Sequence, residues 1–138
     1  MRYLLDTSIV SEPVKPRPSA EILRRLREHE SECAIAAPIW HELRFGVLRL
    51  RASKRRKLLE HYVEEVVRSA YPILAYDEAA ADRHARERAL LEASGRVTAW
   101  VDGQIAAIAL VSGLVLVTLN RRHFTPFRDL RIETWTAG

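Results

Sequence analysis

Three acidic residues, far apart in the chain, each stand among residues that should belong to a hydrophobic core. Asp6 lies in YLLDTSIV, Glu42 in APIWHELRFG and Asp102 in WVDGQIAAIAL. A carboxylate beside a core is costly unless it is paired or binds a cation, and hard divalent cations prefer oxygen ligands. If the three acids converge, they form a site for such a cation, and the chain is predicted to be a metal-dependent hydrolase.

The predicted elements bring these acids to one edge of a sheet. The apolar run 1–5 predicts a buried strand, so Asp6 leaves the sheet at the strand's carboxyl end. Residues 33–37 predict a second strand, and Glu42 falls in the early turns of the helix that follows it. Asp102 falls in the first turns of a helix that leads into another buried strand. Because a helix that follows a parallel strand starts at the strand's carboxyl edge, all three carboxylates are expected there.

The whole chain alternates predicted strands and helices. Strands are predicted at 1–5, 33–37, 71–75, 114–119 and 131–135, the last at a sheet edge, and helices at 19–30, from Pro38, at 53–69, from an N-cap at Asp77 to 94, and from 99 toward Gly113. The proline-containing stretch 11–18 is expected to be an ordinary surface loop. Helices in this order predict an α/β fold with a central, mostly parallel sheet covered on both faces.

Length and composition fit one domain over residues 1–138. The chain is 48% hydrophobic, which is sufficient for a single core. It opens on a strand-like segment without a cationic leader, and no apolar run approaches the roughly 20 residues of a membrane span. A cytoplasmic protein is therefore expected. The single cysteine, Cys33, is expected to be a small buried side chain.

Several other chemistries are disfavoured by the sequence. The five histidines show no zinc-binding spacing, and there is no phosphate-binding or dinucleotide glycine pattern and no serine nucleophile elbow. The remaining acids are expected to be surface partners of neighbouring arginines: Glu28, Glu60, Glu64, Glu65, Glu87 and Glu92.

The charge is basic, with a formal net charge of +4, which favours polyanionic partners. Basic residues crowd the end of the Glu42 helix and the start of the next: Arg44, Arg49, Arg51, Lys54, Arg55, Arg56 and Lys57. Two interpretations stay open, a solvated helix face and a surface that follows a phosphate backbone. In the second, Arg44, Arg49 and Arg51 are the candidates for contact with RNA.

The motifs resemble a known family. The segments LLDTSIVSEP, APIWHELRFGVLRL and GRVTAWVDGQIAAIALVSGLVLVTLN, with the closing Trp135, together resemble PIN-domain ribonucleases of the VapC-like toxin group, close to the FitB-like branch. The resemblance covers essentially the whole chain, in the family's order and spacing. It implies a small α/β/α sandwich and an endoribonuclease that uses Mg²⁺ or Mn²⁺. It also implies a homodimer and a complex with a small antitoxin, through which the pair binds operator DNA.

The resemblance also assigns roles to individual residues. Asp6 and Asp102 match the ligands of Mg²⁺ or Mn²⁺, and Glu42 matches the acid of the family's A-E-L element, which here reads His41-Glu42-Leu43. In such a site Asp6 and Asp102 would hold the cation, while Glu42 orients or deprotonates the attacking water. Asn120 stands where family members carry aspartate or asparagine. Its carbonyl oxygen can coordinate a cation but adds no charge, so a second tightly held metal ion is not expected in the free protein.

Three further polar residues surround these positions. Thr7 and Thr118 are expected to hydrogen-bond to ligand oxygens, although either also suits a turn or a strand. His123 stands where many relatives have an acid, and is expected at the rim without a catalytic role. The product of attack by water would carry a 5′-phosphate and leave a 3′-hydroxyl on the other fragment.

Two other functions are compatible with the same residues. In the first, catalysis has lapsed because of Asn120, and the acidic pocket of a PIN-like binding module docks an arginine of a partner. In the second, Asp6 is the nucleophile of a phosphatase or a phospho-acceptor domain, but the sequence lacks the second aspartate and the lysine that such proteins place nearby. A nuclease assay separates the first of these from the ribonuclease.

Overall fold

Five short strands form one parallel sheet in the order β3-β2-β1-β4-β5. The computed structural model describes residues 1–136. Its strands are β1 (Tyr3–Leu5), β2 (Cys33–Ala36), β3 (Ile73–Leu74), β4 (Val115–Val117) and β5 (Ile132–Glu133). Each lies within a predicted strand but is shorter than predicted. The sheet is parallel throughout, and the predicted edge strand at 131–135 is at an edge.

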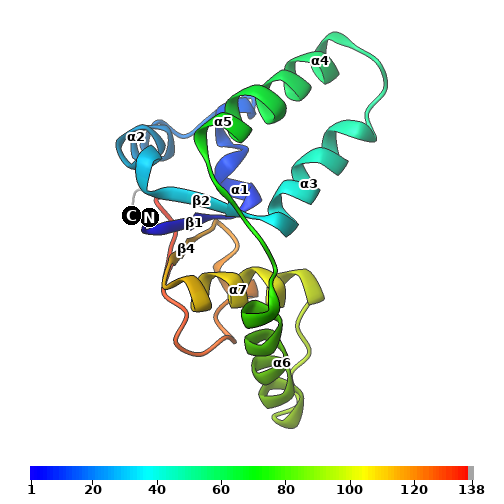
Figure 1. Ribbon diagram of the computed structural model, residues 1–138. Helices are drawn as coiled ribbons and strands as arrows, with labels where there is room; N and C mark the ends of the chain where they lie inside the picture. The colour runs from blue at the N-terminus through cyan, green and yellow to red at the C-terminus, as the bar shows by residue number, and fades with distance from the viewer. Residues whose placement is uncertain (137–138) are drawn as a thin grey trace.

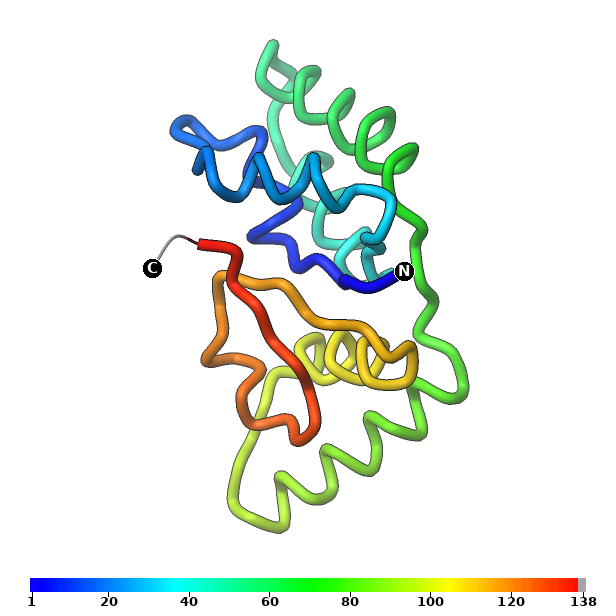
Figure 2. Tube along the Cα trace, turned by 90° about the vertical axis from the view of Figure 1, so that its left-hand side faces the viewer, coloured from blue at the N-terminus to red at the C-terminus, as the bar shows by residue number. Residues whose placement is uncertain are grey.

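Helices cover both sides of this sheet (Figure 1). In chain order they are α1 (Thr7–Val10), the 3₁₀ turn η1 (Glu12–Val14), α2 (Ala20–His29), the 3₁₀ turn η2 (Glu30–Glu32), α3 (Ala37–Leu48), α4 (Lys54–His61), the π-helical η3 (Tyr62–Val67), α5 (Arg68–Ala70), α6 (Glu78–Ala93), α7 (Trp100–Ser112) and the 3₁₀ turn η4 (Arg121–His123). The helices that connect β1, β2 and β3 lie on one side, and α6 and α7 lie on the other, as Figures 1 and 2 both show. The predicted α/β architecture is confirmed.

Polar caps and one glycine set the helix boundaries. The side chains of Ser19, Ser53 and Asp77 accept hydrogen bonds from backbone N–H groups in the first turns of α2, α4 and α6. The predicted N-cap at Asp77 is therefore confirmed. Helix α7 ends at Gly113, whose φ of 66° is left-handed and suits glycine. This turn leads directly into β4, the neighbour of β1.

The core lies between the sheet and the two helical layers. The central strands β1 and β4 are buried along their whole length, whereas the edge strand β3 is partly exposed. Ile9 and Ile39 fill the core from α1 and α3, and Ile105 and Ile108 fill it from α7. Cys33 is buried, as predicted, and this burial raises the pKa of its thiol to about 12. No helix in the described range 1–136 is long and apolar enough to cross a membrane.

The prediction of an ordinary surface loop at 11–18 was wrong for Glu12 but is confirmed for the outer part, where Pro13, Pro16, Arg17 and Pro18 are exposed. The first part of this stretch is the turn η1, and its first residue, Glu12, is buried. The carboxylate of Glu12 accepts a hydrogen bond from the backbone N–H of Ser19 at 2.8 Å and pairs with the ammonium of Lys15. These contacts satisfy the charge, and they hold the pKa of Glu12 below its usual value although burial opposes this. Short-range patterns did not show this enclosed carboxylate.

The prediction that Glu87 lies on the surface was also wrong. This side chain on α6 is only 3% exposed. Its Oε2 lies 3.3 Å from Nε of Arg83 and 3.2 Å from Nε of Arg128. Two guanidinium groups therefore neutralise one enclosed carboxylate, and Arg128 ties the β4–β5 connection to α6.

Candidate active site

The site lies where the order of the strands reverses. From β1 the chain moves outward to β2 and β3, then crosses to β4 on the other side of β1. In open α/β sheets, ligands bind at such a reversal, beyond the carboxyl ends of the strands. Leu5 pairs with Val117, so Asp6 and Thr118 leave the two central strands side by side.

One cavity of about 520 Å³ opens at this edge. Its lining includes all four residues predicted to be catalytic: Asp6, Glu42, Asp102 and Asn120. The other lining residues are Thr7, Ser8, Ala99, Val101, Ile105, His123 and Phe124. The four predicted catalytic residues, which are up to 114 positions apart in the sequence, thus line one space.

Hydrogen bonds fix the orientation of Asp6, which is almost completely buried. The hydroxyl of Thr118 donates to Oδ2 of Asp6 at 2.6 Å and accepts from the backbone N–H of Asn120 at 2.9 Å. The hydroxyl of Ser8 lies 3.4 Å from the same carboxylate oxygen and accepts from the backbone N–H of Leu119 at 3.0 Å. The segment after β4 is thereby bound to the carboxylate that follows β1.

This arrangement predicts that Thr118→Val destabilises the protein. Valine has nearly the same shape but removes the O–H that donates to the buried Asp6 carboxylate and the oxygen that accepts from Asn120. A hydrogen bond to a charged group contributes about 1.5–3 kcal/mol, so the free energy of unfolding in urea should fall by about that amount. Thr125→Val is the matched control, because the hydroxyl of Thr125 bonds only to an exposed carbonyl. Equal unfolding midpoints for wild type and Thr118→Val would contradict this role.

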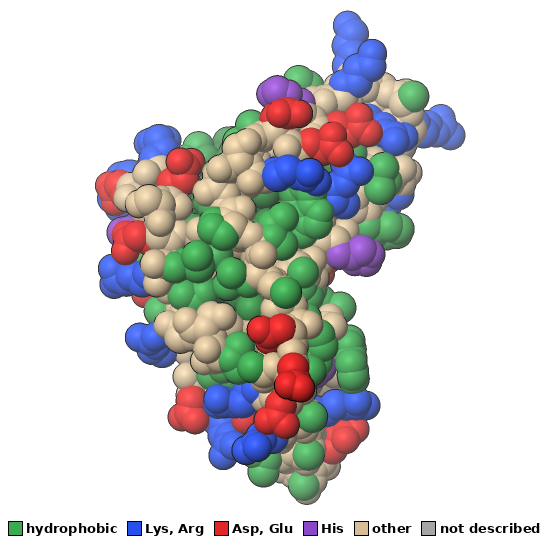
Figure 3. Space-filling view, viewed as in Figure 1, with side chains coloured by type: hydrophobic (Ala, Val, Ile, Leu, Met, Phe, Trp, Pro, Cys, Tyr) green, Lys and Arg blue, Asp and Glu red, His purple; other side chains and the backbone are tan. Residues whose placement is uncertain are grey.

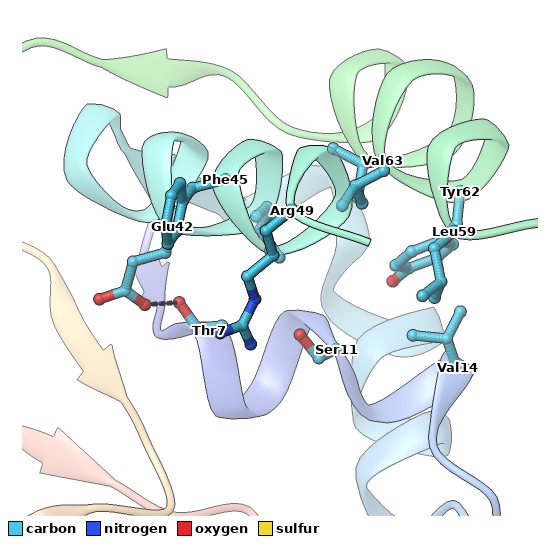
Figure 4. A pocket seen from close by; sticks show the side chains of 12 residues that line it. Thr7, Ser11, Val14, Glu42, Phe45, Arg49, Leu59, Tyr62 and Val63 are labelled. Carbon is cyan, nitrogen blue, oxygen red and sulfur yellow. Dashed lines mark hydrogen bonds between the residues drawn. The ribbon is translucent and has the colours of Figure 1, made fainter. Parts of the chain in front are cut away.

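Glu42 reaches the cavity from the other side. Pro38 occupies the first turn of α3 as predicted, and Glu42 lies one turn further along that helix. The hydroxyl of Thr7 donates to Oε2 of Glu42 at 2.5 Å, which joins the start of α1 to α3 (Figure 4). Glu42 itself is exposed to solvent. One of its carboxylate oxygens is therefore held in place beside water-accessible space.

Asp102 completes the acidic group from the first turn of α7. Burial raises the pKa of its carboxyl. His123, whose Nδ1 lies 3.7 Å from Oδ2 of Asp102, lowers it, and the charges of Asp6 and Glu42 raise it further. Asp102 therefore lies within the electrostatic influence of both other carboxylates of the cavity. His123 lies on the lining, as expected for a rim residue.

The donor set suits a hard divalent cation that keeps part of its water shell. Within residues 1–136, no three His, Cys, Asp or Glu side chains are close enough together to enclose a metal ion by themselves. Mg²⁺ characteristically binds through one or two carboxylates and retains several waters, and a carbonyl oxygen such as that of Asn120 can add a further ligand. The mutual repulsion of the carboxylates is relieved by a cation. The residues present therefore fit one such ion.

Ser8 was not singled out in the sequence. The one available signal was its position two residues after Asp6 at the start of a short helix, where a hydroxyl can reach both the carboxylate and the neighbouring strand's backbone. Its bond to Leu119 depends on the pairing of β1 with β4, which joins residues more than 100 positions apart. Local sequence patterns do not report such a contact.

The three arginines predicted to contact RNA are placed differently. Arg44 forms an ion pair of 2.6 Å with Glu64 of η3. Arg51 lies exposed in the α3–α4 connection, where basic side chains gather at the upper end of the molecule (Figure 3). Arg49 lines a groove that adjoins the acidic cavity.

The chain has an all-parallel, five-stranded α/β/α fold with an acidic cavity where the strand order reverses, which is the architecture of PIN domains. The family model of the PIN domain matches residues 3–130, so the chain belongs to the PIN-domain family. It is 30% identical over 137 residues to the tRNA(fMet)-specific endonuclease VapC of Shigella flexneri, with 99% of both chains covered. It is 32% identical over 124 residues to the toxin FitB of Neisseria gonorrhoeae, covering 88% of this chain and 89% of FitB. A solved structure of FitAB bound to an IR36 DNA fragment matches with a TM-score of 0.89 at 27% identity, covering 99% of this chain and 97% of that one. The predicted resemblance to VapC-like and FitB-like PIN proteins is confirmed.

Proposed function

We propose that the chain is a metal-dependent endoribonuclease and the toxin of a toxin–antitoxin pair. The observation that carries this proposal is the shared cavity lined by the carboxylates of Asp6, Glu42 and Asp102. The names of the relatives support it, since they include ribonucleases and toxins of the same family over nearly the whole chain.

In this proposal Asp6 and Asp102 hold Mg²⁺ or Mn²⁺ through carboxylate oxygens, and the carbonyl oxygen of Asn120 completes the protein's share of the ligands. The bound cation supplies Lewis-acid polarisation of the scissile phosphate and neutralises charge that develops on its oxygens. Thr118 and Ser8 keep the Asp6 carboxylate in one orientation, so that it does not have to be reorganised when substrate binds.

Glu42 is the base that orients or deprotonates the attacking water. The Thr7 hydroxyl fixes one carboxylate oxygen, and the other can accept a hydrogen bond from water in the cavity. Attack by water breaks the bond from phosphorus to the 3′ oxygen and leaves a 5′-phosphate and a 3′-hydroxyl. The partner of this toxin is a small antitoxin that covers the site. In this proposal the chain acts in the cytoplasm as a homodimer, within a hetero-oligomer that binds operator DNA through the antitoxin. The solved structures of FitAB bound to a DNA fragment and of DNA-bound VapBC support the DNA-binding part of this proposal.

The proposal is tested with the purified, antitoxin-free chain and several RNAs containing unpaired loops. Cleavage should require Mg²⁺ or Mn²⁺, stop on addition of a chelator, and leave 5′-phosphate ends. If the wild-type protein binds its protein partner but cleaves none of the RNAs with either metal, the lapsed binding module is the better description.

Metal binding should also be visible without any substrate. A ligand present at about 100 times its dissociation constant stabilises the folded state by about 2.7 kcal/mol. For a domain of this size that corresponds to an increase in melting temperature of roughly 10 °C. We expect saturating Mn²⁺ to raise the melting temperature of the wild type, and Asp6→Asn and Asp102→Asn to lose most of this increase. An undiminished increase in both variants would remove these residues as ligands.

A further inference from the structure

A second hollow continues from the acidic cavity along the face of α3. It is a groove of about 420 Å³, and it shares Thr7 and Glu42 with the cavity. Its walls include Phe45 and Arg49 from α3, Leu59 from α4 and Tyr62 from η3 (Figure 4). A chain molecule that places one unit over the acids can therefore extend its next unit into this groove.

Helix α3 carries an aromatic and basic stripe, of which Phe45 and Arg49 line the groove. His41, Phe45 and the C-cap residue Arg49 are spaced four residues apart and so lie on one face of the helix. The rings of His41 and Phe45 are stacked with centroids 6.2 Å apart and planes 17° apart, and the guanidinium carbon of Arg49 lies 5.9 Å from the centre of the Phe45 ring. Phe45 is nevertheless 57% exposed. An aromatic face and a cation are thus presented together to solvent.

The charge of Arg49 is not used within the fold. Arg44 of α3 pairs with Glu64, and Arg56 of α4 pairs with Glu60. Arg49, in contrast, forms no ion pair among the described residues. In Figure 4 its side chain runs from α3 across the groove toward Thr7 on α1. Among residues 1–136, it is the one arginine or lysine side chain on the lining of either hollow. A polyanion beside three carboxylates needs such a counter-charge.

We infer that the groove binds the unpaired nucleotide that flanks the cleaved phosphate. Its base lies against Phe45 and the apolar wall formed by Leu59 and Tyr62, and Arg49 binds its phosphate. Stacking on aromatic side chains combined with phosphate contacts from arginine is how proteins hold single-stranded nucleic acid, and a paired base would not be free to enter. This inference rests on the proposed function, since it names a subsite for the same substrate. It also selects Arg49, rather than Arg44, as the phosphate contact.

The occupant is a nucleotide rather than a protein segment because of the stripe on α3. An apolar peptide would use the Leu59 and Tyr62 wall but would leave the guanidinium of Arg49 without a partner. A nucleotide matches both halves of the groove, the base with the apolar wall and the phosphate with the cation. The groove and the acidic cavity adjoin at Thr7 and Glu42. Two neighbouring nucleotides of one RNA chain can therefore occupy the cavity and the groove at the same time.

The test uses a short single-stranded oligoribonucleotide that the wild-type protein cleaves at one bond, and a set of copies with one abasic nucleotide at each position around that bond. In the wild type, an abasic nucleotide at one flanking position should raise KM about tenfold. Phe45→Ala should raise KM for the intact substrate by a similar factor and should no longer respond to the abasic change. Leu48→Ala is the matched control, because Leu48 is an exposed residue of α3 that does not line the groove. It should keep the full abasic effect.

Arg49 is tested in parallel with its own control. Arg49→Gln should raise KM about tenfold with little change in kcat and should flatten the salt dependence of KM. Arg86→Gln should do neither, because Arg86 is an exposed residue of α6 in the other helical layer. If the wild type cleaves RNA and Phe45→Ala and Arg49→Gln both keep wild-type KM values and the full abasic effect, the nucleotide subsite is wrong. If these variants lose only affinity for the antitoxin, the groove belongs to the protein partner, and the inference is equally overturned. Absence of cleavage by the wild type would instead count against the proposed function.

Discussion

Asp6→Asn should abolish RNA cleavage while the chain stays folded. The change replaces one of two metal-binding carboxylates with a neutral amide, and the loss of several kcal/mol of transition-state stabilisation corresponds to a decrease in kcat of about 10³-fold or more. The amide oxygen can still accept the hydrogen bond from Thr118, so the buried position stays satisfied. Removing one of three interacting negative charges should leave the metal-free protein at least as stable as the wild type. Initial cleavage rates and urea unfolding, measured on the same preparations, check both parts.

Asp129→Asn is the matched control for this prediction. The side chain of Asp129 is 78% exposed, and its only ion pair within residues 1–136 is a 3.9 Å contact with Arg83. Its left-handed φ of 63° is one that asparagine tolerates well. This variant should cleave at the wild-type rate.

Asp102→Asn is an independent second variant, because Asp102 lies on α7 and outside the hydrogen bonds that join β1 to β4. Wild-type cleavage by folded Asp6→Asn and Asp102→Asn would end the assignment of these carboxylates to catalysis.

Gly103→Ala should destabilise the protein by about 2–3 kcal/mol, which is a large effect for the addition of one methyl group. A Cβ atom at Gly103 would lie 2.2 Å from Nε2 and 2.6 Å from Cδ2 of His84. The imidazole cannot simply move away, because it is buried, its Nδ1 shares a hydrogen bond of 2.8 Å with the hydroxyl of Tyr76, and its ring packs edge-on against Trp100. Urea unfolding should show a lower midpoint at an unchanged slope.

The same Gly-to-Ala change at Gly46 is a control, because it is expected not to lower the free energy of unfolding. Gly46 lies inside α3, and a Cβ there would meet no atom within 4 Å. Alanine is more favourable than glycine in a helix interior by about 1 kcal/mol, so Gly46→Ala should be neutral or stabilising. A double variant, Gly103→Ala with His84→Ala, should be more stable than the sum of the single effects, because the second change removes the atoms that clash. Additive effects in this pair would show that the clash is not the cause.

The sequence was sufficient to predict the edge of the sheet at which the acids meet. The buried runs before Asp6 and before the helix of Glu42 define strands, and parallel α/β topology then determines which end of each strand carries the following residue. Periodicity and capping residues also located the helices, as the N-cap at Asp77 shows. These features depend on patterns within about 20 residues, which a single sequence displays directly.

What could not be predicted depends on contacts between distant segments. Glu87 looks like an ordinary surface acid on an amphipathic helix, and its enclosure requires Arg128, which lies 41 residues further along the chain. Gly103 looks like a tolerated helix glycine, and the reason for it is a histidine on another helix. Ser8 holds the backbone after β4 only because the first and fourth strands are neighbours. Each of these contacts follows from the packing of the finished fold, so none leaves a local signature.

The tie between the beginning and the end of the chain has a consequence for synthesis. Asp6 is synthesised more than 100 residues before the hydroxyl and backbone groups that orient it, which belong to Thr118, Leu119 and Asn120. Because a nascent chain emerges from its N-terminus, the partial product lacks β4 and the groups that follow it until that segment has been translated. In the proposed ribonuclease, the metal-binding carboxylate would therefore stay unoriented, and the catalytic centre unassembled, until β4 has left the ribosome and paired with β1.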